Sequence, residues 1–377
     1  MFEQPPHLVH IFPAYSIRGP QVRTAGLINH FGPRYRHTIV SLDRETSARG
    51  LIAPDLDVGV LGPPPRAALP LRRTHFRRWL YQLQPDLILT YDWGGMEAAL
   101  ANLWLPLAPQ IHHEDGFGDE ERYGQSLSRR WVRRMLLPQM GRVVVPSRTL
   151  EAMARTSWHV PVERLRHIPN GIDVAPYAGH AEPDGLPGLR RLPGELVVGA
   201  AAALYRVKNL ERLVRAFAAA PNRHVARLVI VGDGPERGAL IEEIVRHELE
   251  ASTLLTGQLD QPHRYLRHFD IFAISSDTEQ MPLSVVEAMA AGLPVIGTDV
   301  GDIRQMVSEP NRDFIVDRNN EAALAAKLDA LLRDGQLRTR LGRANRAKAQ
   351  AEFAFERMAE SYASLYEEIL MPRPVPA

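Results

Sequence analysis

The stretch Ser275-Ser-Asp-Thr-Glu-Gln-Met-Pro-Leu-Ser-Val-Val-Glu-Ala-Met-Ala-Ala-Gly-Leu-Pro-Val295 decides the fold of the second half of this chain. It follows a short apolar run at 271–274, and its pattern predicts a strand, a loop and a helix that opens near Pro282. Glu279 lies in the loop and Glu287 on the second turn of the helix. Open α/β sheets bind ligands outside the carboxyl ends of their strands, and helix N-termini attract anions. The stretch therefore predicts carboxylates facing sugar hydroxyls beside a phosphate.

Two glutamates at this spacing are more often solvated surface charges. The strand before them, Pro282 at the helix start and the small residues of Ala288-Met-Ala-Ala-Gly292 favour a binding site instead.

Short apolar runs alternate with amphipathic stretches in the rest of the chain, which is typical of βα units on a parallel sheet. Helices are expected at 209–219 and 283–291, among others. The first series of expected strands lies at 8–12, 38–42, 58–61, 87–90 and 143–145, and the second at 196–202, 227–231, 253–255, 271–274, 294–297 and 314–316.

The alternation weakens between Pro176 and Pro193, where Pro, Gly and charged residues dominate as in a hinge. We therefore expect an α/β protein with two doubly wound, Rossmann-like domains. The expected boundaries are 1–180 for the N-terminal domain and 190–353 for the C-terminal domain. A final helix at 354–371 is expected to pack back across the hinge.

The amino-acid composition excludes several classes of site and partner. The chain has 377 residues, of which 45% are hydrophobic, enough for two cores. It contains no Cys, which excludes disulfides and thiolate chemistry and suits a cytoplasmic location. A net charge of +1 does not fit a nucleic-acid partner. We find no signal peptide and no apolar run long enough to span a bilayer.

Several segments together resemble the retaining GT-B glycosyltransferases of family 4. The Glu279–Glu287 pair matches their Glu-x7-Glu signature, and Glu287-Ala-Met-Ala-Ala-Gly-Leu-Pro-Val295 matches the segment that begins at its second Glu. Further matches occur in the order that the family has: Ile168-Pro-Asn-Gly-Ile-Asp173, Lys208-Asn209, Val231-Gly-Asp-Gly-Pro235 and Val300-Gly301.

The resemblance implies a GT-B fold whose two domains face each other across a cleft, with the acceptor bound by the 1–180 domain and the nucleotide sugar by the 190–353 domain. It also implies roles for residues of the second domain. Glu279 would contact the transferred sugar, Glu287 the ribose of the nucleotide, and Lys208 the donor diphosphate. The family has an Arg where this chain has Ala203, and Arg206 is the candidate to supply that charge. Lys208 on its own would be an ordinary surface lysine. Further donor contacts are expected at Gly19, Gly232, Met281, Pro282 and Leu283.

The stretch Ile111-His-His-Glu-Asp-Gly-Phe-Gly118 is expected to be a polar loop after a strand end. Zinc binding is the alternative, but adjacent residues rarely hold one ion together, so the polar loop is favoured. The resemblance places this loop at the cleft, with His113 and Asp115 as contacts of the acceptor or sugar.

Other patterns are weaker. Asp55-Leu-Asp57 has the Asp-x-Asp spacing of metal-dependent transferases, but we expect both carboxylates to be solvated. Gly232, Gly234 and Gly238 nearly form a dinucleotide loop, with a last spacing one residue too long. Two arginine-rich helical faces beside Trp79 and Trp131 are expected to be solvated or to lie on anionic membrane: Arg72, Arg73, Arg77 and Arg78, and Arg129, Arg130, Arg133 and Arg134.

We therefore expect a cytoplasmic, retaining hexosyltransferase that moves a sugar from a nucleoside-diphosphate sugar such as a UDP or GDP sugar. Its acceptor would be an unidentified sugar or lipid-linked molecule used in polysaccharide, glycolipid or glycoconjugate synthesis. No metal and no cofactor are expected, and membrane contact would be weak and peripheral, at the inner face. The alternatives are a nucleotide-sugar 2-epimerase and an inactive sugar-nucleotide-binding protein. The sequence does not identify the nucleoside, the sugar, the acceptor or the oligomeric state.

Overall fold

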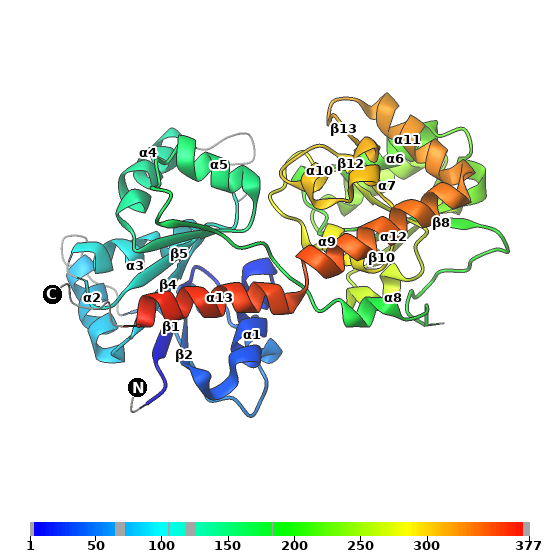
Figure 1. Ribbon diagram of the computed structural model, residues 1–377. Coiled ribbons are helices and arrows are strands. Elements are labelled where there is room, and N and C mark those ends of the chain that lie inside the picture. The colour runs from blue at the N-terminus through cyan, green and yellow to red at the C-terminus, as the bar shows by residue number, and fades with distance from the viewer. Residues whose placement is uncertain (1–3, 65–71, 105, 118–125, 183, 372–377) are drawn as a thin grey trace. The chain divides into compact units, whose positions relative to one another are not determined.

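The computed structural model describes residues 4–64, 72–104, 106–117, 126–182 and 184–371. The chain forms two compact units (Figure 1). Unit 1 contains residues 1–170 and 358–377, and unit 2 contains residues 171–357. Among the described residues, no helix has both the length and the apolar character needed to cross a membrane.

Unit 1 is built on a parallel seven-stranded sheet with the order β3-β2-β1-β4-β5-β6-β7. The strands are β1 (His7–Phe12), β2 (Arg36–Ser41), β3 (Val58–Leu61), β4 (Leu87–Tyr91), β5 (Gln110–His113), β6 (Arg142–Val145) and β7 (Leu165–His167). The helices are α1 (Gly19–Phe31), α2 (Arg72–Leu83), α3 (Asp92–Trp104), α4 (Leu127–Leu136) and α5 (Arg148–Thr156).

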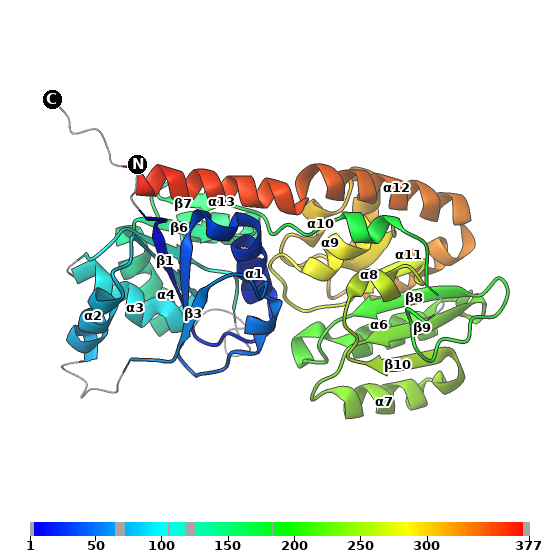
Figure 2. The ribbon, with the colours of Figure 1, turned by 90° about the horizontal axis from the view of Figure 1, so that it is seen from below.

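Unit 2 is built on a parallel six-stranded sheet with the order β10-β9-β8-β11-β12-β13, in which β8, β9 and β10 lie side by side (Figure 2). The strands are β8 (Leu196–Ala201), β9 (Ala226–Val231), β10 (Thr253–Gly257), β11 (Ile271–Ile274), β12 (Val295–Thr298) and β13 (Ile315–Val316). The helices are α6 (Leu210–Ala219), α7 (Arg237–Arg246), α8 (Pro262–Leu266), α9 (Leu283–Ala290), α10 (Ile303–Met306), α11 (Glu321–Arg333) and α12 (Gly335–Glu352).

Helices cover both faces of the unit 2 sheet. Side chains alternate along a strand, so Val197 and Val198 belong to different cores. Val198 packs with residues of α6, α7 and α11, whereas Val197 packs with residues of α8 and α9. Burial on both faces explains why these strands are short, continuous apolar runs in the sequence.

Both sheets confirm the expected doubly wound, Rossmann-like architecture. The first six strands of each follow the order 3-2-1-4-5-6, which reverses between β1 and β4 in unit 1 and between β8 and β11 in unit 2. Ligands bind such sheets at the carboxyl ends of the strands that flank this reversal. In unit 2 the flanking strands end at Ala201 and Ile274, directly before the segments that contain Lys208 and Glu279.

Two strands were not expected. β5 and β7 are short, and each contains a single apolar residue, Ile111 in β5 and Leu165 in β7. As a consequence, His112 and His113 belong to β5 and are buried, and the polar loop begins only after them. The prediction that both histidines lie in a loop after a strand end was therefore wrong. Gly118 of that stretch lies outside the described residues.

The boundary between the units is at Asn170, ten residues before the expected boundary at 180. Residue Ile172 already belongs to unit 2, because its N–H donates to the Phe353 carbonyl and its carbonyl accepts from the Phe355 N–H. The last helix, α13 (Phe355–Leu370), begins in unit 2, and its residues from Met358 onward belong to unit 1.

Candidate functional site

Lys208 and Glu279 meet at the reversal point of the unit 2 sheet. Lys208 follows β8 in a short 3-10 turn, η7 (Arg206–Lys208), and Glu279 lies in the loop after β11. The Lys208 Nζ donates to Glu279 Oε1 at 2.6 Å, and the Ser276 hydroxyl donates to the same oxygen at 2.7 Å. The Lys208 side chain is 25% exposed and that of Glu279 9%, so the pair is open to solvent on the lysine side.

A hydrogen-bonded network fixes the two loops that carry this pair. Asn209 adopts the left-handed conformation (φ 42°) and caps α6 by accepting from the Arg212 N–H. Arg212 donates to the Ser275 carbonyl at 2.8 Å and to the Asp277 carboxylate at 2.7 Å. The Asp277 N–H donates to the Val207 carbonyl at 2.8 Å. Lys208 therefore sits on a rigid turn rather than on a free surface loop.

The start of α9 lies next to Glu279. Pro282 is its N-cap and accepts from the Val285 N–H at 3.1 Å. The N–H groups before Val285, at the start of the helix, favour an anion. Gly301 (φ 56°) packs so closely that a Cβ there would lie 2.4 Å from the Glu279 carbonyl and 2.7 Å from the Gln280 carbonyl. Only glycine fits this position, which explains the Val300-Gly301 segment. Met281 and Pro282 are buried, and Leu283 is partly buried.

Glu287 lies on the second turn of α9, partly buried. Burial raises the pKa of its carboxyl group to about 7, although a hydrogen bond with the Tyr177 hydroxyl lowers it in part. Tyr177 belongs to the 3-10 turn η6 (Ala175–Ala178), which follows the Ile168–Asp173 segment. A buried carboxylate with one neutral partner retains acceptor capacity for further hydroxyl groups.

Gly232 directly follows β9 and packs against the loop after β8. It is buried, and a Cβ there would lie 1.9 Å from the Ala202 carbonyl, so the glycine lets the loop after β9 pack on the loop after β8. Likewise, a Cβ at Gly234 would lie 2.7 Å from the Leu204 carbonyl oxygen. This close backbone packing explains Gly232 and Gly234, whereas a Cβ at Gly238 would meet nothing within 4 Å.

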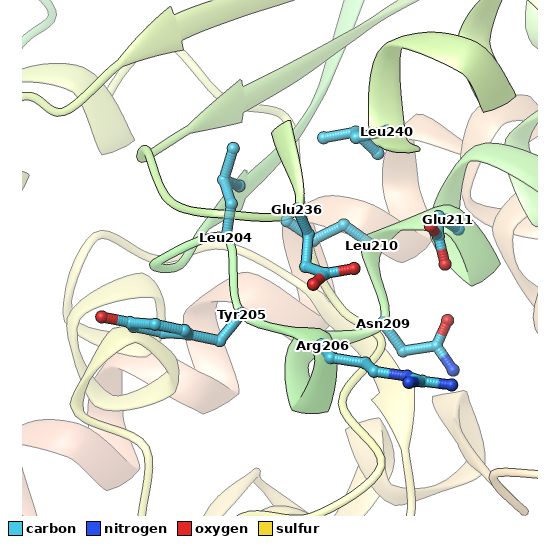
Figure 3. Close-up of a pocket in the computed structure, with 8 residues that line it drawn as sticks. All are labelled: Leu204, Tyr205, Arg206, Asn209, Leu210, Glu211, Glu236 and Leu240. Carbon is cyan, nitrogen blue, oxygen red and sulfur yellow. The ribbon is translucent and has the colours of Figure 1, made fainter. Parts of the chain in front are cut away.

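Arg206 lines a pocket whose lining residues do not include Lys208. It is exposed on the outer side of η7, and its side chain extends toward Asn209 while Tyr205 points the opposite way (Figure 3). The pocket is a shallow surface hollow that also contains two carboxylates, those of Glu211 and Glu236. Its lining residues are Leu204, Tyr205, Arg206, Asn209, Leu210, Glu211, Glu236 and Leu240.

In unit 1, Asp115 lies just beyond the carboxyl end of β5 and is held by Arg23. The Arg23 guanidinium, on α1, binds both carboxylate oxygens of Asp115, one of them at 2.8 Å, and donates to Asn170 Oδ1 at 2.9 Å. The Asp115 N–H donates to the Asp92 carboxylate at 2.9 Å. Burial and the negative charges of Asp115 and Glu114 raise the pKa of Asp92 well above its usual range.

His113 is buried at the end of β5, between two aromatic rings. Its ring stacks on Tyr91, with centroids 4.5 Å apart, and faces Tyr362 of α13 at 5.8 Å. Burial and the charge of Arg23 lower the pKa of His113 well below 6.5, so the imidazole is neutral. Gly19 opens α1 after β1, at the reversal point of the unit 1 sheet.

The arginines of α4 do not form one solvated face. Arg133 is buried, and its Nε donates to Glu114 Oε1 at 2.9 Å among the rings of Trp93, Phe117 and Trp158. Arg129 lies over the Trp93 ring at 5.1 Å. Arg130 and Arg134 are exposed. The expectation of a uniform basic face was therefore wrong for α4, because two of its four arginines turn inward.

On α2, Arg78 is exposed and Arg77 partly buried, and the side chains of Arg72 and Arg73 lie outside the described residues. Asp55 and Asp57 are exposed in the turn before β3.

Several residues of these sites were not found in the sequence. Ser276 and Asp277 lie inside the quoted stretch but have no distinctive spacing. Tyr177 and Arg23 reach their partners from distant segments, and no pattern in the sequence indicates them. Asp92 had a usable signal, because it directly follows an expected strand on a parallel sheet.

Two family models match the chain. Residues 17–176 match the model described as Glycosyltransferase Family 4, and residues 189–348 match Glycosyl transferases group 1. Together the two models span most of both units. The chain belongs to the family 4 glycosyltransferases.

Curated relatives agree with this family. N-acetyl-alpha-D-glucosaminyl L-malate synthase of Bacillus anthracis is 28% identical over 165 residues, which cover 44% of this chain and 43% of that protein. GDP-mannose-dependent alpha-mannosyltransferase of Mycolicibacterium smegmatis is 28% identical over 247 residues, which cover 64% of this chain and 62% of that protein. The matched part of this glycosyltransferase thus spans less than two thirds of each relative's length.

Solved structures show the GT-B fold. The crystal structure of Anabaena HepE in complex with UDP has a TM-score of 0.80 at 18% identity and covers 96% of this chain and 100% of that one. Sucrose-phosphate synthase of Thermosynechococcus elongatus has a TM-score of 0.74 at 21% identity, with 96% and 98% covered.

Proposed function

We propose that this glycosyltransferase is a retaining, metal-independent enzyme that moves a sugar from a nucleoside-diphosphate sugar bound by unit 2 to an acceptor bound by unit 1. One observation carries the proposal: Lys208 and Glu279 meet at the reversal point of the unit 2 sheet, beside the N-terminus of α9. A cation and free helical N–H groups suit a diphosphate, and a carboxylate suits sugar hydroxyls.

In this proposal the protein acts mainly by electrostatic stabilisation. Lys208 and the first turn of α9 stabilise the diphosphate as it leaves, and Glu279 orients the sugar. The Lys208 ammonium already donates to the Glu279 carboxylate at 2.6 Å. This contact would hold both side chains in position to bind the donor. A donor phosphate oxygen takes the proton of the acceptor hydroxyl on the face from which the diphosphate leaves, so the anomeric configuration is retained. Losing one preorganised group of this kind costs about 3 kcal/mol of transition-state stabilisation.

Arg206 is not included among the proposed diphosphate ligands, because it lines the pocket with Glu211 and Glu236. Asp115 is the proposed acceptor contact of unit 1, since it lies at the carboxyl end of β5 in a fixed orientation. His113, stacked between Tyr91 and Tyr362, would hold the end of β5 in place. Glu287, oriented by Tyr177, would accept hydrogen bonds from the ribose.

The names of similar proteins support the donor class only. UDP is bound in the HepE structure, and GDP-mannose appears in the name of the mannosyltransferase relative. We propose a nucleoside-diphosphate sugar as the donor and a sugar or lipid-linked molecule as the acceptor. A location in the cytoplasm, at the inner face of the membrane, belongs to the same proposal.

Substitution of the two glutamates tests the site, because they would touch different parts of the donor. Glu287→Gln should bind free nucleoside diphosphate more weakly, by about 1.5 to 3 kcal/mol, since it loses a charge-assisted hydrogen bond to the ribose. Glu279→Gln should bind free nucleotide like the wild type but lose kcat, because its contact strengthens as the glycosidic bond breaks. Calorimetry with UDP, GDP and ADP and steady-state hydrolysis of the matching sugar donors measure both effects.

Glu242→Gln provides the matched control, because Glu242 is exposed on α7 and should change neither quantity. If both site variants bind nucleotide and turn over like this control, the proposed donor site is wrong. Conversion of the donor to its 2-epimer without acceptor would identify an epimerase. Tight nucleotide binding without turnover in the wild type would identify an inactive binding protein.

A further inference from the structure

Helix α4 carries an apolar stripe on its outward face. Leu127, Trp131 and Met135 are 81%, 63% and 47% exposed. They are spaced four residues apart and therefore line up on one side of the helix. Within the described ranges, no other helix exposes three large apolar side chains. Isolated exposed apolar residues are ordinary, but an aligned set that includes a tryptophan marks an interaction surface.

Positive charge flanks the stripe. Arg130 and Arg134 are exposed and follow the same side of the helix, one turn apart. Arg129 and Arg133 point inward instead, toward Trp93 and Glu114. The segment 127–139 contains no acidic residue. The charged side chains of α4 itself are therefore all cations, while Asp119, Glu120 and Glu121 before it lie outside the described residues.

We propose that this face of α4 docks on an anionic lipid bilayer. Trp131 would lie at the level of the headgroups, Leu127 and Met135 would enter the acyl boundary, and Arg130 and Arg134 would pair with lipid phosphates. Two features favour a bilayer over a second copy of this chain. An anionic surface complements the arginines, whereas two such faces would bring four arginines together. A narrow stripe on one short helix also suits shallow insertion rather than a dimer core.

Helix α2 does not offer the same surface. Its Trp79 is partly buried and packs edge-on against Phe76 in the core of unit 1, and its exposed side chains include His75, Arg78 and Tyr81. The structure thus assigns the membrane contact to one helix. This docking deepens the proposed location at the inner face of the membrane and rests on that part of the proposed function. Because α4 belongs to unit 1 and the donor residues to unit 2, it can be tested separately from the donor site.

Vesicle flotation of the full chain tests the proposal. The wild type should float with vesicles of phosphatidylcholine containing roughly a third phosphatidylglycerol, much less with phosphatidylcholine alone, and less as salt rises. Replacing the stripe (Leu127→Ser, Trp131→Ser, Met135→Ser) should abolish flotation. Arg130→Glu with Arg134→Glu should weaken partitioning by at least about 30-fold, since each arginine near the surface contributes about a fivefold gain.

Two controls match these variants. Arg78→Glu with Arg155→Glu changes the charge of unit 1 by the same amount at exposed positions on α2 and α5. Ile241→Ser with Val245→Ser removes two exposed apolar residues from α7. Both controls should float almost like the wild type. Far-UV circular dichroism and thermal unfolding establish that every variant is folded.

Three results would overturn the proposal. One is a wild type that stays in solution with the anionic vesicles at low salt. Another is a stripe variant that is folded and floats like the wild type. The third is light scattering that shows a wild-type dimer which Trp131→Ser converts to monomer, because a second copy would then cover this face. Calorimetry with nucleotide on the same samples measures whether the proposed donor site binds, independently of the flotation result.

Discussion

Glu287 couples nucleotide binding to pH, because burial raises the pKa of its carboxyl group to about 7. In the proposed site this group accepts hydrogen bonds from the ribose only when it is ionised. Below about pH 7 a proton competes with the nucleotide, so the affinity for nucleoside diphosphate should fall by up to about tenfold per pH unit. Calorimetry between about pH 6 and pH 8 measures this dependence. The same measurement on Glu287→Gln shows only the pH dependence that comes from the nucleotide phosphates. The difference between the two proteins is therefore the contribution of Glu287.

The same residue should limit the stability of the free protein. A carboxyl whose pKa is raised on folding stabilises the fold below its unfolded pKa, and this contribution is lost as the pH rises through the folded pKa. At about pH 8, Glu287→Gln should therefore be more stable than the wild type, by at most about 3 kcal/mol, while binding nucleotide more weakly. A variant that is destabilised at pH 8 would contradict the buried, charged state assigned to Glu287.

Individual residues were predictable where local sequence fixes them. Glu279 and Glu287 stand beside a strand end and a helix start, so their spacing places them at the carboxyl edge of a sheet. Lys208 was indicated only by the resemblance to the family. Arg23 and Tyr177 could not be predicted, because each reaches its partner through a tertiary contact between distant segments.

Helix α4 is held against unit 1 by the buried ion pair between Arg133 and Glu114. Burial alone would raise the pKa of Glu114, but hydrogen bonds and charge from His112 and Arg133 outweigh burial and lower that pKa. Arg133→Met should destabilise unit 1 by about 3 to 5 kcal/mol, because it leaves a buried carboxylate without its cation. Urea unfolding followed by tryptophan fluorescence measures the loss.

The matched variant pairs Arg133→Met with Glu114→Gln. This double variant should recover most of the lost stability, because the uncompensated charge is gone. Arg134→Met, one position along on the exposed face, should change stability by less than about 0.5 kcal/mol. Equal losses in the single and the double variant would show that packing of the Arg133 side chain, rather than charge, holds the helix.

Elements were predictable where the hydrophobic pattern is regular. The apolar runs of β8, β9 and β11 contain little but aliphatic and aromatic residues, and their expected positions agree with the structure to within one residue. β5 (Gln110–His113) is buried on both faces although three of its four residues are polar. Two of these polar side chains bind partners on other elements. Thr90 of β4 hydrogen-bonds His112 at 2.8 Å, and Asn102 of α3 donates to Gln110 at 3.0 Å. No local pattern encodes such partners.

The two units should respond to acid in opposite directions. Burial lowers the pKa of His10 well below 6.5 and that of His37 to about 4, and His7 and His113 are lowered as well. A histidine with a lowered pKa stabilises the fold above its unfolded pKa, near 6.5, and this contribution is lost as the pH falls. His37 alone should cost unit 1 about 3 kcal/mol by pH 4. None of the five histidines in unit 2 is buried, and Glu287 gains a proton there.

Hydrogen exchange read by peptide at about pH 7, 6 and 5, with rates corrected for intrinsic pH dependence, distinguishes the units. Peptides of β1, β2 and β4 should lose protection first, while those of β8, β9 and β11 keep theirs. His37→Gln should reduce the loss in unit 1, and His224→Gln, at an exposed position of unit 2, should have no effect. Uniform loss in both units would show that the buried histidines do not set the acid response.

Because of helix α13, unit 2 is completed before unit 1 during synthesis. Unit 1 begins with the first residues made, yet its core includes Tyr362 against His113 and Tyr366 against Phe31. Both tyrosines are buried and leave the ribosome after all of unit 2. Domains fold as units while the chain grows, so the unit that starts first must wait for the last helix. Until then its exposed core is a target for chaperones, and a message truncated near codon 357 would yield a finished unit 2 attached to an unfinished unit 1.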